Sequence, residues 1–448
     1  MRARGPGFGI WTILLAAAVL FGPSTSFAGN FEGVASCAGS TCHGRAEGNG
    51  AVVRQDELLQ WQEPSSKTGA HSRAYSVLSG QRSRQIAATL GLGPATSAPA
   101  CIGCHATNAG GQSGPRFRLS EGVGCESCHG ASSAWLPTHF TLGANRSANI
   151  ARGLIPLENP RTRARVCLDC HFGSGNPGQF VTHRMMAAGH PRLSFELDLF
   201  SALQQHHNED ADYAARKGRL DSVQLWAVGQ AEAVKRSVSL FADPKLGTEG
   251  VFPEFYFYDC HSCHRRIDDG PQRTLSFQTN PGRPIPFGMP PYNDENILML
   301  SAVAKVLAPR QAASFDSASR QFHAAMGGGR GAAVAAAGKL AGAADGLSAG
   351  LAAGGHGSDT AFRVIATIAG EAVSDRFTDY SGSVQAVMAV DTLLNALVRQ
   401  GRITVGAAAG IRADVNRAYA AVRAPNAYNP AAFRAALGSA ARAVAALK

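Results

Sequence analysis

The sequence predicts a mainly α-helical protein with two different parts. All ten cysteines lie before residue 307, in a stretch rich in Gly, Pro and His, which is typical of loops and short helices. After residue 308 cysteine and tryptophan are absent and alanine dominates, which favours longer helices. We therefore expect a cleaved leader at 1–28, a loop-rich, short-helix domain at 29–307 and an α-helical bundle at 308–448.

The leader has the pattern of a secretory signal peptide. Arg2 and Arg4 precede an apolar run over 10–21, and residues 26–28 place small side chains at the cleavage position. The apolar run is short, whereas a membrane span needs about twenty residues. We expect cleavage and a mature chain without a transmembrane span, with an uncleaved anchor as the alternative. The predicted location is the periplasm, with the cell surface as the second choice.

The short-helix domain carries cysteine pairs, and each pair is followed directly by a histidine. Four pairs have a two-residue spacer, and the first has four residues between its cysteines. We number the motifs along the chain: motif 1 is Cys37, Cys42 and His43; motif 2 is Cys101, Cys104 and His105; motif 3 is Cys125, Cys128 and His129; motif 4 is Cys167, Cys170 and His171; motif 5 is Cys260, Cys263 and His264.

This order of residues is the attachment signal of haem c. Two thiols bond to the vinyl groups of the porphyrin, and the next imidazole binds the iron as the proximal ligand. Zinc ribbons, dithiol redox sites and disulfide frameworks also use paired cysteines, but none of them requires the trailing histidine. We therefore predict five covalently attached haems c. For motif 1, whose spacer must bulge, attachment through Cys42 alone is the alternative.

The sixth iron ligand separates an electron carrier from an enzyme, because an iron with two imidazole ligands has no position left for a substrate. Nine histidines lie outside the proximal positions. The candidates for distal ligands are His71, His139, His190, His183 and one of the adjacent pair His206 and His207, where crowding disfavours binding by both. We expect His261, inside motif 5, to be poorly placed for its own iron, and His323 and His356 to be ordinary surface residues. Glu196 and Asp259 are candidates for hydrogen bonds to ligand histidines.

The formal net charge of +10 does not indicate nucleic-acid binding. Five haems bring about ten propionates, which basic side chains commonly neutralise. No basic run with interleaved aromatic residues is present in the sequence. We therefore expect no nucleic-acid partner.

The alanine-rich part shows helical periodicity. Residues 383–400 place Val387, Val390, Leu394 and Leu397 on one face, and a similar spacing continues from Phe433 to Leu447. The glycine-rich stretch at 327–331 predicts a loop or linker. These signals indicate the helices of a small bundle.

Several segments around the motifs resemble the multihaem cytochromes related to the tetrahaem electron carrier of ammonia oxidisers, the cytochrome c-552/c-554 type. They are Gly122–Gly130 with Trp135 and His139, Ala188–Leu197, Trp226–Gln230 and Tyr258–His264. The resemblance spans roughly residues 37 to 292 and implies distal ligation by His71, His139 and His190, with haems in close-packed pairs. It departs from the carrier in having five motifs instead of four and a wider first motif. The same superfamily contains hydroxylamine oxidoreductase and octahaem tetrathionate reductase.

The leading functional hypothesis is a periplasmic pentahaem cytochrome that transfers single electrons between redox partner proteins, either periplasmic or membrane-bound. The alternative is an oxidoreductase with one open haem that acts on a small nitrogen or sulfur oxyanion. A third hypothesis is a subunit of a larger electron conduit, with the alanine-rich helices as its docking element. Whether the protein is an enzyme stays open, with electron transfer favoured. The sequence leaves the oligomeric state undetermined.

Overall fold

The computed structural model describes residues 29–48, 54–107, 110, 112–207, 209–218, 221–248, 250–264, 282–285, 288–357, 359–373 and 380–448. The predicted signal peptide at 1–28 lies outside these residues. The described chain is mainly α-helical, as predicted, and within it there are two isolated β-bridges but no β-strand.

The described residues between 29 and 221 form loops and short helices. Its α-helices are α1 (Glu57–Gln62), α2 (Gln81–Leu90), α3 (Pro99–His105), α4 (Cys125–His129), α5 (Arg146–Ala151), α6 (Pro160–His171), α7 (His183–Ala187), α8 (Leu197–Leu203) and α9 (Ala211–Lys217). None is longer than α6, whose twelve residues begin at the cap of Asn159 and at Pro160. These helices cannot bury much apolar surface by themselves.

Longer helices follow and form a bundle. They are α10 (Ser222–Ala242), α12 (Glu295–Leu307), α13 (Pro309–Ala325), α14 (Arg330–Ala353), α15 (Thr360–Ala372), α16 (Tyr380–Arg399), α17 (Val405–Ala421) and α18 (Pro430–Ala445). The predicted periodic segments at 383–400 and 433–447 correspond to α16 and α18. The sequence predicts a loop or linker for the glycine-rich stretch at 327–331, and its first part connects α13 to α14 through the 3₁₀ segment Met326–Gly328 and Gly329. Its last two residues, Arg330 and Gly331, already belong to α14.

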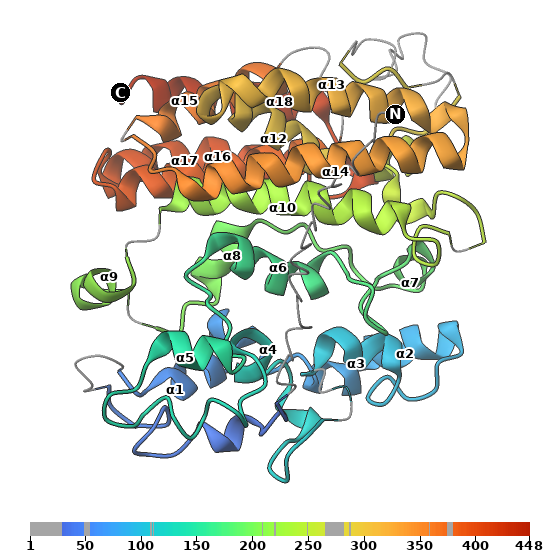
Figure 1. Ribbon diagram of the computed structural model, residues 1–448. Coiled ribbons are helices and arrows are strands. Elements are labelled where there is room, and N and C mark those ends of the chain that lie inside the picture. The colour runs from blue at the N-terminus through green and yellow to red at the C-terminus, as the bar shows by residue number, and fades with distance from the viewer. Residues whose placement is uncertain are drawn as a thin grey trace, which may run out of the picture.

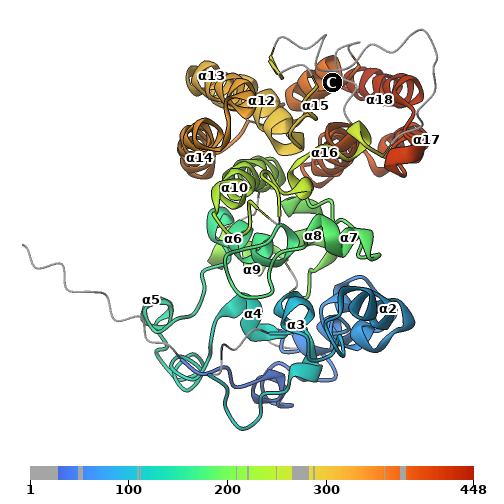
Figure 2. The same ribbon diagram turned by 90° about the vertical axis from the view of Figure 1, so that its right-hand side faces the viewer.

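The bundle lies on one side of the molecule and the short helices on the other (Figures 1 and 2). Helix α10 runs along the junction, with α14 above it and with α6 and α8 below it (Figure 1). Gly229 of α10 permits the close approach of α8, because a Cβ atom there would lie 2.6 Å from the Cβ of Leu197. Helix α10 is therefore the element that joins the two parts.

One large hydrophobic core fills the bundle. It includes Trp226 and Phe241 of α10 and Leu300 of α12 together with apolar residues of every helix from α13 to α18. The core therefore includes α10, and also Phe180 before it, so that it extends to the amino-terminal side of the boundary at residue 307 that composition indicates. On the other side of α10 the buried apolar clusters are much smaller.

Within the described residues, one helix has the length and apolar composition of a membrane span, namely α16 (Tyr380–Arg399). In its most apolar window 78% of the residues are buried inside the protein. Its apolar character is thus accounted for by its position in the bundle core.

A buried carboxylate connects the bundle to the short helices. Glu232 of α10 accepts hydrogen bonds from Arg161 of α6 (2.7 Å) and from Ser348 of α14 (2.7 Å), and it pairs with Arg165 at 3.3 Å. Burial opposes ionisation, but the hydrogen bonds from Ser348 and Arg161 hold the pKa of Glu232 below its ordinary value. Glu232 is therefore ionised in the folded protein and neutralised by two guanidinium groups.

We expect Glu232→Gln to lower the free energy of unfolding by about 2–3 kcal/mol, because it removes a buried charge partner from Arg161. The folded-state pKa lies below the unfolded value of 4.5, so the contribution of Glu232 is present above pH 4.5 and is lost as the pH falls through the folded pKa. Denaturant midpoints measured by circular dichroism between pH 3 and pH 7 would check this, because the difference between wild type and variant should shrink in acid.

Asp345→Asn is the matched control. Asp345 bonds the same Arg161 and also Lys235, but its side chain is 44% exposed. We expect a loss below about 1 kcal/mol for this exposed pair. Equal losses in the two variants would contradict the assignment of the effect to burial.

Candidate functional site

The motifs lie at the ends of short helical segments. Motifs 2, 3 and 4 end α3, α4 and α6, so that the histidine is the last residue of each helix. The second cysteine and the histidine follow the first cysteine by three and four positions, so both lie on the same side of the helical turn as the first cysteine. Motif 5 begins in a 3₁₀ segment, Cys260–Ser262. None of the ten cysteines forms a disulfide.

Motif 1 reaches a comparable geometry through consecutive turns. The amide of Cys42 donates to the carbonyl of Gly39 (2.8 Å), and the amide of His43 donates to the carbonyl of Cys37 (3.2 Å). Gly44 then passes so close to the chain that a Cβ atom there would lie 2.1 Å from the carbonyl oxygen of Ala38. The four-residue spacer is therefore taken up by a compact loop.

Each motif histidine faces a histidine from another part of the chain. The pairs and the separations of their ring centroids are His43 and His139 (6.3 Å), His71 and His171 (6.3 Å), His105 and His190 (6.3 Å), His183 and His264 (6.1 Å), and His129 with both His206 (6.3 Å) and His207 (6.1 Å). Every histidine that the sequence names as a distal candidate takes part. Ligation by these residues stays a prediction.

The separations fit two imidazoles on opposite sides of one metal ion. Two metal–nitrogen bonds of about 2 Å each, and roughly 1.2 Å from each nitrogen to its ring centroid, add to about 6.4 Å. Direct ring packing does not require such a distance, and the six pairs at the five motifs share it within 0.2 Å. The residues present could therefore hold the irons of haem groups between them.

Many of these rings are oriented through Nδ1. This atom lies 2.7 Å from the carbonyl oxygen of Ala74 in His105, and 2.7 Å from that of Leu136 in His139. Corresponding contacts join His190 to Pro191 (2.8 Å) and His206 to Gln204 (2.8 Å). A proton on Nδ1 leaves Nε2 as the free donor atom, which is the arrangement of metal-ligating histidines.

The buried rings are also kept neutral. Burial, with smaller contributions from His207 and His206, lowers the pKa of His129 to about 3. Burial lowers the pKa of His171 and of His206 to about 4 in each case. A metal ligand must have an unprotonated nitrogen, so these three rings are in the required form at neutral pH.

A cavity of about 410 Å³ lies among motifs 1, 3 and 4. Its wall includes cysteines and histidines of these motifs and the apolar residues Trp61, Leu154 and Phe200. Burial, with a smaller contribution from the nearby Cys128, raises the pKa of the Cys167 thiol. A second, smaller cavity is lined by Cys170 and Arg192. Apolar space beside the cysteines suits a flat hydrophobic group.

No pattern in the sequence indicates that a carboxylate, Glu57, lies beside motif 1. Glu57 is buried, and its Oε2 lies 3.0 Å from Nδ1 of His43, while its Oε1 lies 3.5 Å from Nδ1 of His207. The histidine of motif 1 is therefore oriented by a side chain fourteen positions away. No spacing rule links the two, because their contact depends on the path of the intervening loop.

Two expectations about other residues need correction, those for His323 and Glu196. His323 is fully buried rather than at the surface, with its Nε2 3.3 Å from Asp294, a carboxylate that also binds Arg283 at 2.6 Å. Glu196 does not bond a histidine: it caps α8 and accepts from Thr392. Asp259 accepts from the amide of Ser381. Glu196 and Asp259 thus connect the motif-bearing part to α16.

His261 lies away from the five pairs. Its Nδ1 is 2.8 Å from the carbonyl oxygen of Pro425, and its ring packs edge-on against Tyr428. His261 lies between the cysteines of motif 5 in the sequence, and its side chain contacts the loop before α18. The expectation that His261 is poorly placed for the iron of its own motif stays a prediction.

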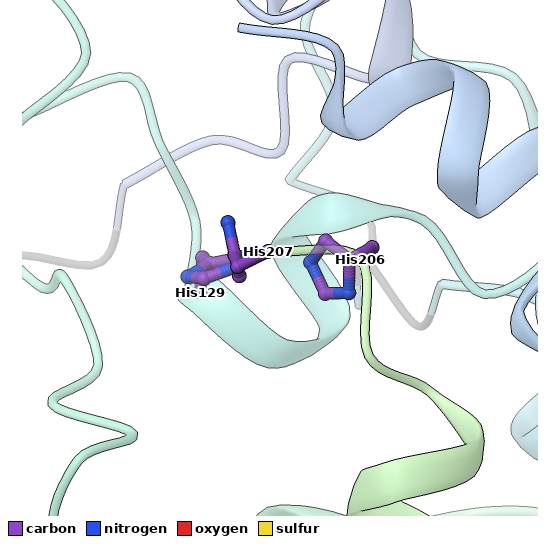
Figure 3. Close-up of side chains that lie close together, drawn as sticks. All are labelled: His129, His206 and His207. Atoms are coloured by element: carbon purple, nitrogen blue, oxygen red, sulfur yellow. The ribbon is translucent and has the colours of Figure 1, made fainter. Parts of the chain in front are cut away.

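Motif 3 differs from the others because two histidines face it. Figure 3 shows His129 at the end of α4, with His206 and His207 gathered beside it. One nitrogen from each of the three rings lies within 4.8 Å of the others.

Residues 36–130 match the family model described as cytochrome c554 and c-prime. The match covers motifs 1, 2 and 3 and about a fifth of the chain. No curated protein and no solved structure shows significant similarity to the chain.

Proposed function

We propose that this chain, a c-type cytochrome related to the cytochrome c554 type, is a periplasmic electron-transfer protein that carries five haems, each held between two histidines. The family match supports haem c and electron transfer. The proposal adds the number of haems, the double histidine ligation and the compartment. The observation that carries it is that each of the five motif histidines faces another histidine at a ring-centroid separation of 6.1 to 6.3 Å.

The chain supplies two things to each site. The cysteines would attach the group covalently, and the motif histidine together with a histidine from a distant segment would hold its iron. When bound, haem c supplies an iron that exchanges one electron between its ferric and ferrous states. Hydrogen bonds donated by Nδ1 fix the rings, so that they do not move when the charge of the iron changes.

The surroundings of each site differ, which would give the sites different reduction potentials. His43 contacts a carboxylate, whereas His105 contacts a backbone carbonyl. A carboxylate makes the imidazole a stronger donor and favours the ferric state. We expect the iron of motif 1 to be harder to reduce than that of motif 2 for this reason.

Location in the periplasm is supported by the leader pattern at 1–28 and by the chemistry of attachment, which is completed outside the cytoplasmic membrane. Redox partner proteins are the expected partners. The described residues give every motif histidine an opposite histidine, so no observation favours an open iron and a substrate.

The test is a set of single substitutions at opposite histidines. We expect His71→Ala, His139→Ala and His190→Ala each to convert one haem of five from low spin to high spin, because each removes the sixth ligand of one iron. Electron paramagnetic resonance of the ferric protein, with haem content measured, would count the converted iron.

His261→Ala is the control, since this ring faces Tyr428 and should leave all five irons low spin. A wild-type protein with a high-spin iron that responds to nitrite, hydroxylamine or cyanide would contradict the proposal. That result would favour the oxidoreductase alternative and would locate the open site.

A further inference from the structure

Two consecutive side chains converge on one motif histidine. Side chains of adjacent residues normally point in different directions, yet the rings of His206 and His207 lie 4.2 Å apart. Both face His129, at 6.3 Å and 6.1 Å, with nearly equal interplanar angles of 82° and 84°. Both rings thus meet the distance requirement that the other four motifs satisfy with one histidine each.

Both rings also have their Nδ1 atoms turned toward an acceptor. For His206 the acceptor is the carbonyl oxygen of Gln204 at 2.8 Å. For His207 it is Oε1 of Glu57 at 3.5 Å. Each ring can therefore offer Nε2 on the side of His129. One coordination position cannot accept two imidazoles at once, so the two rings compete for it.

We propose that His206 and His207 are alternative sixth ligands of the iron at motif 3, with His206 bound at rest and His207 in reserve. His206 is assigned as the resting ligand because its Nδ1 contact is shorter and is made to a fixed backbone carbonyl. His207 has a 37% exposed side chain and the longer contact. The inference rests on the proposed function, because it needs an iron at motif 3.

Glu57 has a specific role in this arrangement. It is buried, and its other oxygen is held at 3.0 Å from Nδ1 of His43. The contact with His43 of motif 1 therefore holds the carboxylate in place. The carboxylate in turn keeps His207 close to motif 3 while His207 is not bound to the iron. Because His207 is kept close in this way, little entropy is lost when it replaces His206 on the iron.

The experiment compares single and double substitutions in the mature holoprotein. We expect His206→Ala to keep all five irons low spin, because His207 moves onto the vacated position, and we expect His207→Ala to do the same through His206. The double variant should show one high-spin iron in five, measured by electron paramagnetic resonance. Added imidazole should return that iron to low spin, which would show that the site is intact.

His190→Ala is the matched control, since within the described residues motif 2 has a single opposite histidine and one iron should become high spin. If His206→Ala alone produces a high-spin iron, His207 is not a reserve ligand and the inference is wrong. If His207→Ala alone produces a high-spin iron, His206 is not the resting ligand and does not replace His207, so both parts of the inference are wrong. If His190→Ala leaves every iron low spin, the proposed ligation itself fails, which separates the two cases.

Discussion

A chain that cannot attach haem is expected to keep its bundle folded and to lose the structure of its first half. The variant has all ten cysteines replaced by alanine. The buried apolar clusters outside the bundle are small: one contains Leu168 and Phe195, and the other contains Leu78 with two alanines. Ordering each residue costs about 1–2 kcal/mol of backbone entropy, which such clusters cannot offset.

The bundle has a different basis for its stability. Its core runs through α10 and α12–α18 and contains no cysteine. We therefore expect circular dichroism of the haem-free chain to retain the helical signal of these long helices. Limited proteolysis should cut within residues 29–160 and leave a resistant carboxy-terminal fragment. The holoprotein, treated in the same way, should resist cleavage in both halves.

A haem-free chain that resisted the protease over its whole length would contradict this expectation. It would mean that the short helices are stabilised by contacts with the bundle, such as those of Glu232, rather than by the haem groups. The position of the first cut therefore distinguishes the two sources of stability.

Replacing Cys167 and Cys170 by serine is expected to have the second largest effect, because motif 4 adjoins three other motifs. Cys167 lies near Cys128 of motif 3, and the Sγ of Cys104 in motif 2 is 4.0 Å from the carbonyl oxygen of Cys170. Arg192, beside Cys170 in the smaller cavity, contacts the Sγ of Cys260 in motif 5 at 3.2 Å. Motif 4 is thus the junction between motif 5 and the others.

The expected result is a protein whose mass is lower by one haem and whose haem absorbance falls by about one fifth. Motif 5 should then exchange electrons with motifs 1 and 3 more slowly, so that reduction of the protein acquires a separate slow phase. Intact mass measurement and stopped-flow reduction would check the two parts.

The matched control for this variant is the replacement of Cys260 and Cys263, which also removes one haem but from the end of the arrangement. The remaining four sites should be reduced together, without a new slow phase. If the variants of motif 4 and motif 5 behaved alike, motif 4 would not be the junction.

The attachment motifs and the main helices could be predicted from the sequence because both depend on local rules. Covalent attachment requires cysteines and histidine within a few residues, so the motifs are complete in the sequence. The apolar periodicity of 383–400 likewise sufficed to predict α16. The histidine candidates could be named by residue type, because few histidines lie outside the motifs.

Only the tertiary structure decided which histidine faces which motif. His71 lies opposite His171 and His139 opposite His43, and no spacing in the chain relates the members of either pair. The same holds for Glu57, and for α10, which composition groups with the motifs but which packs in the bundle core. These contacts join segments far apart in the sequence, and they arise from how the loops fold back, which local patterns of residues do not specify.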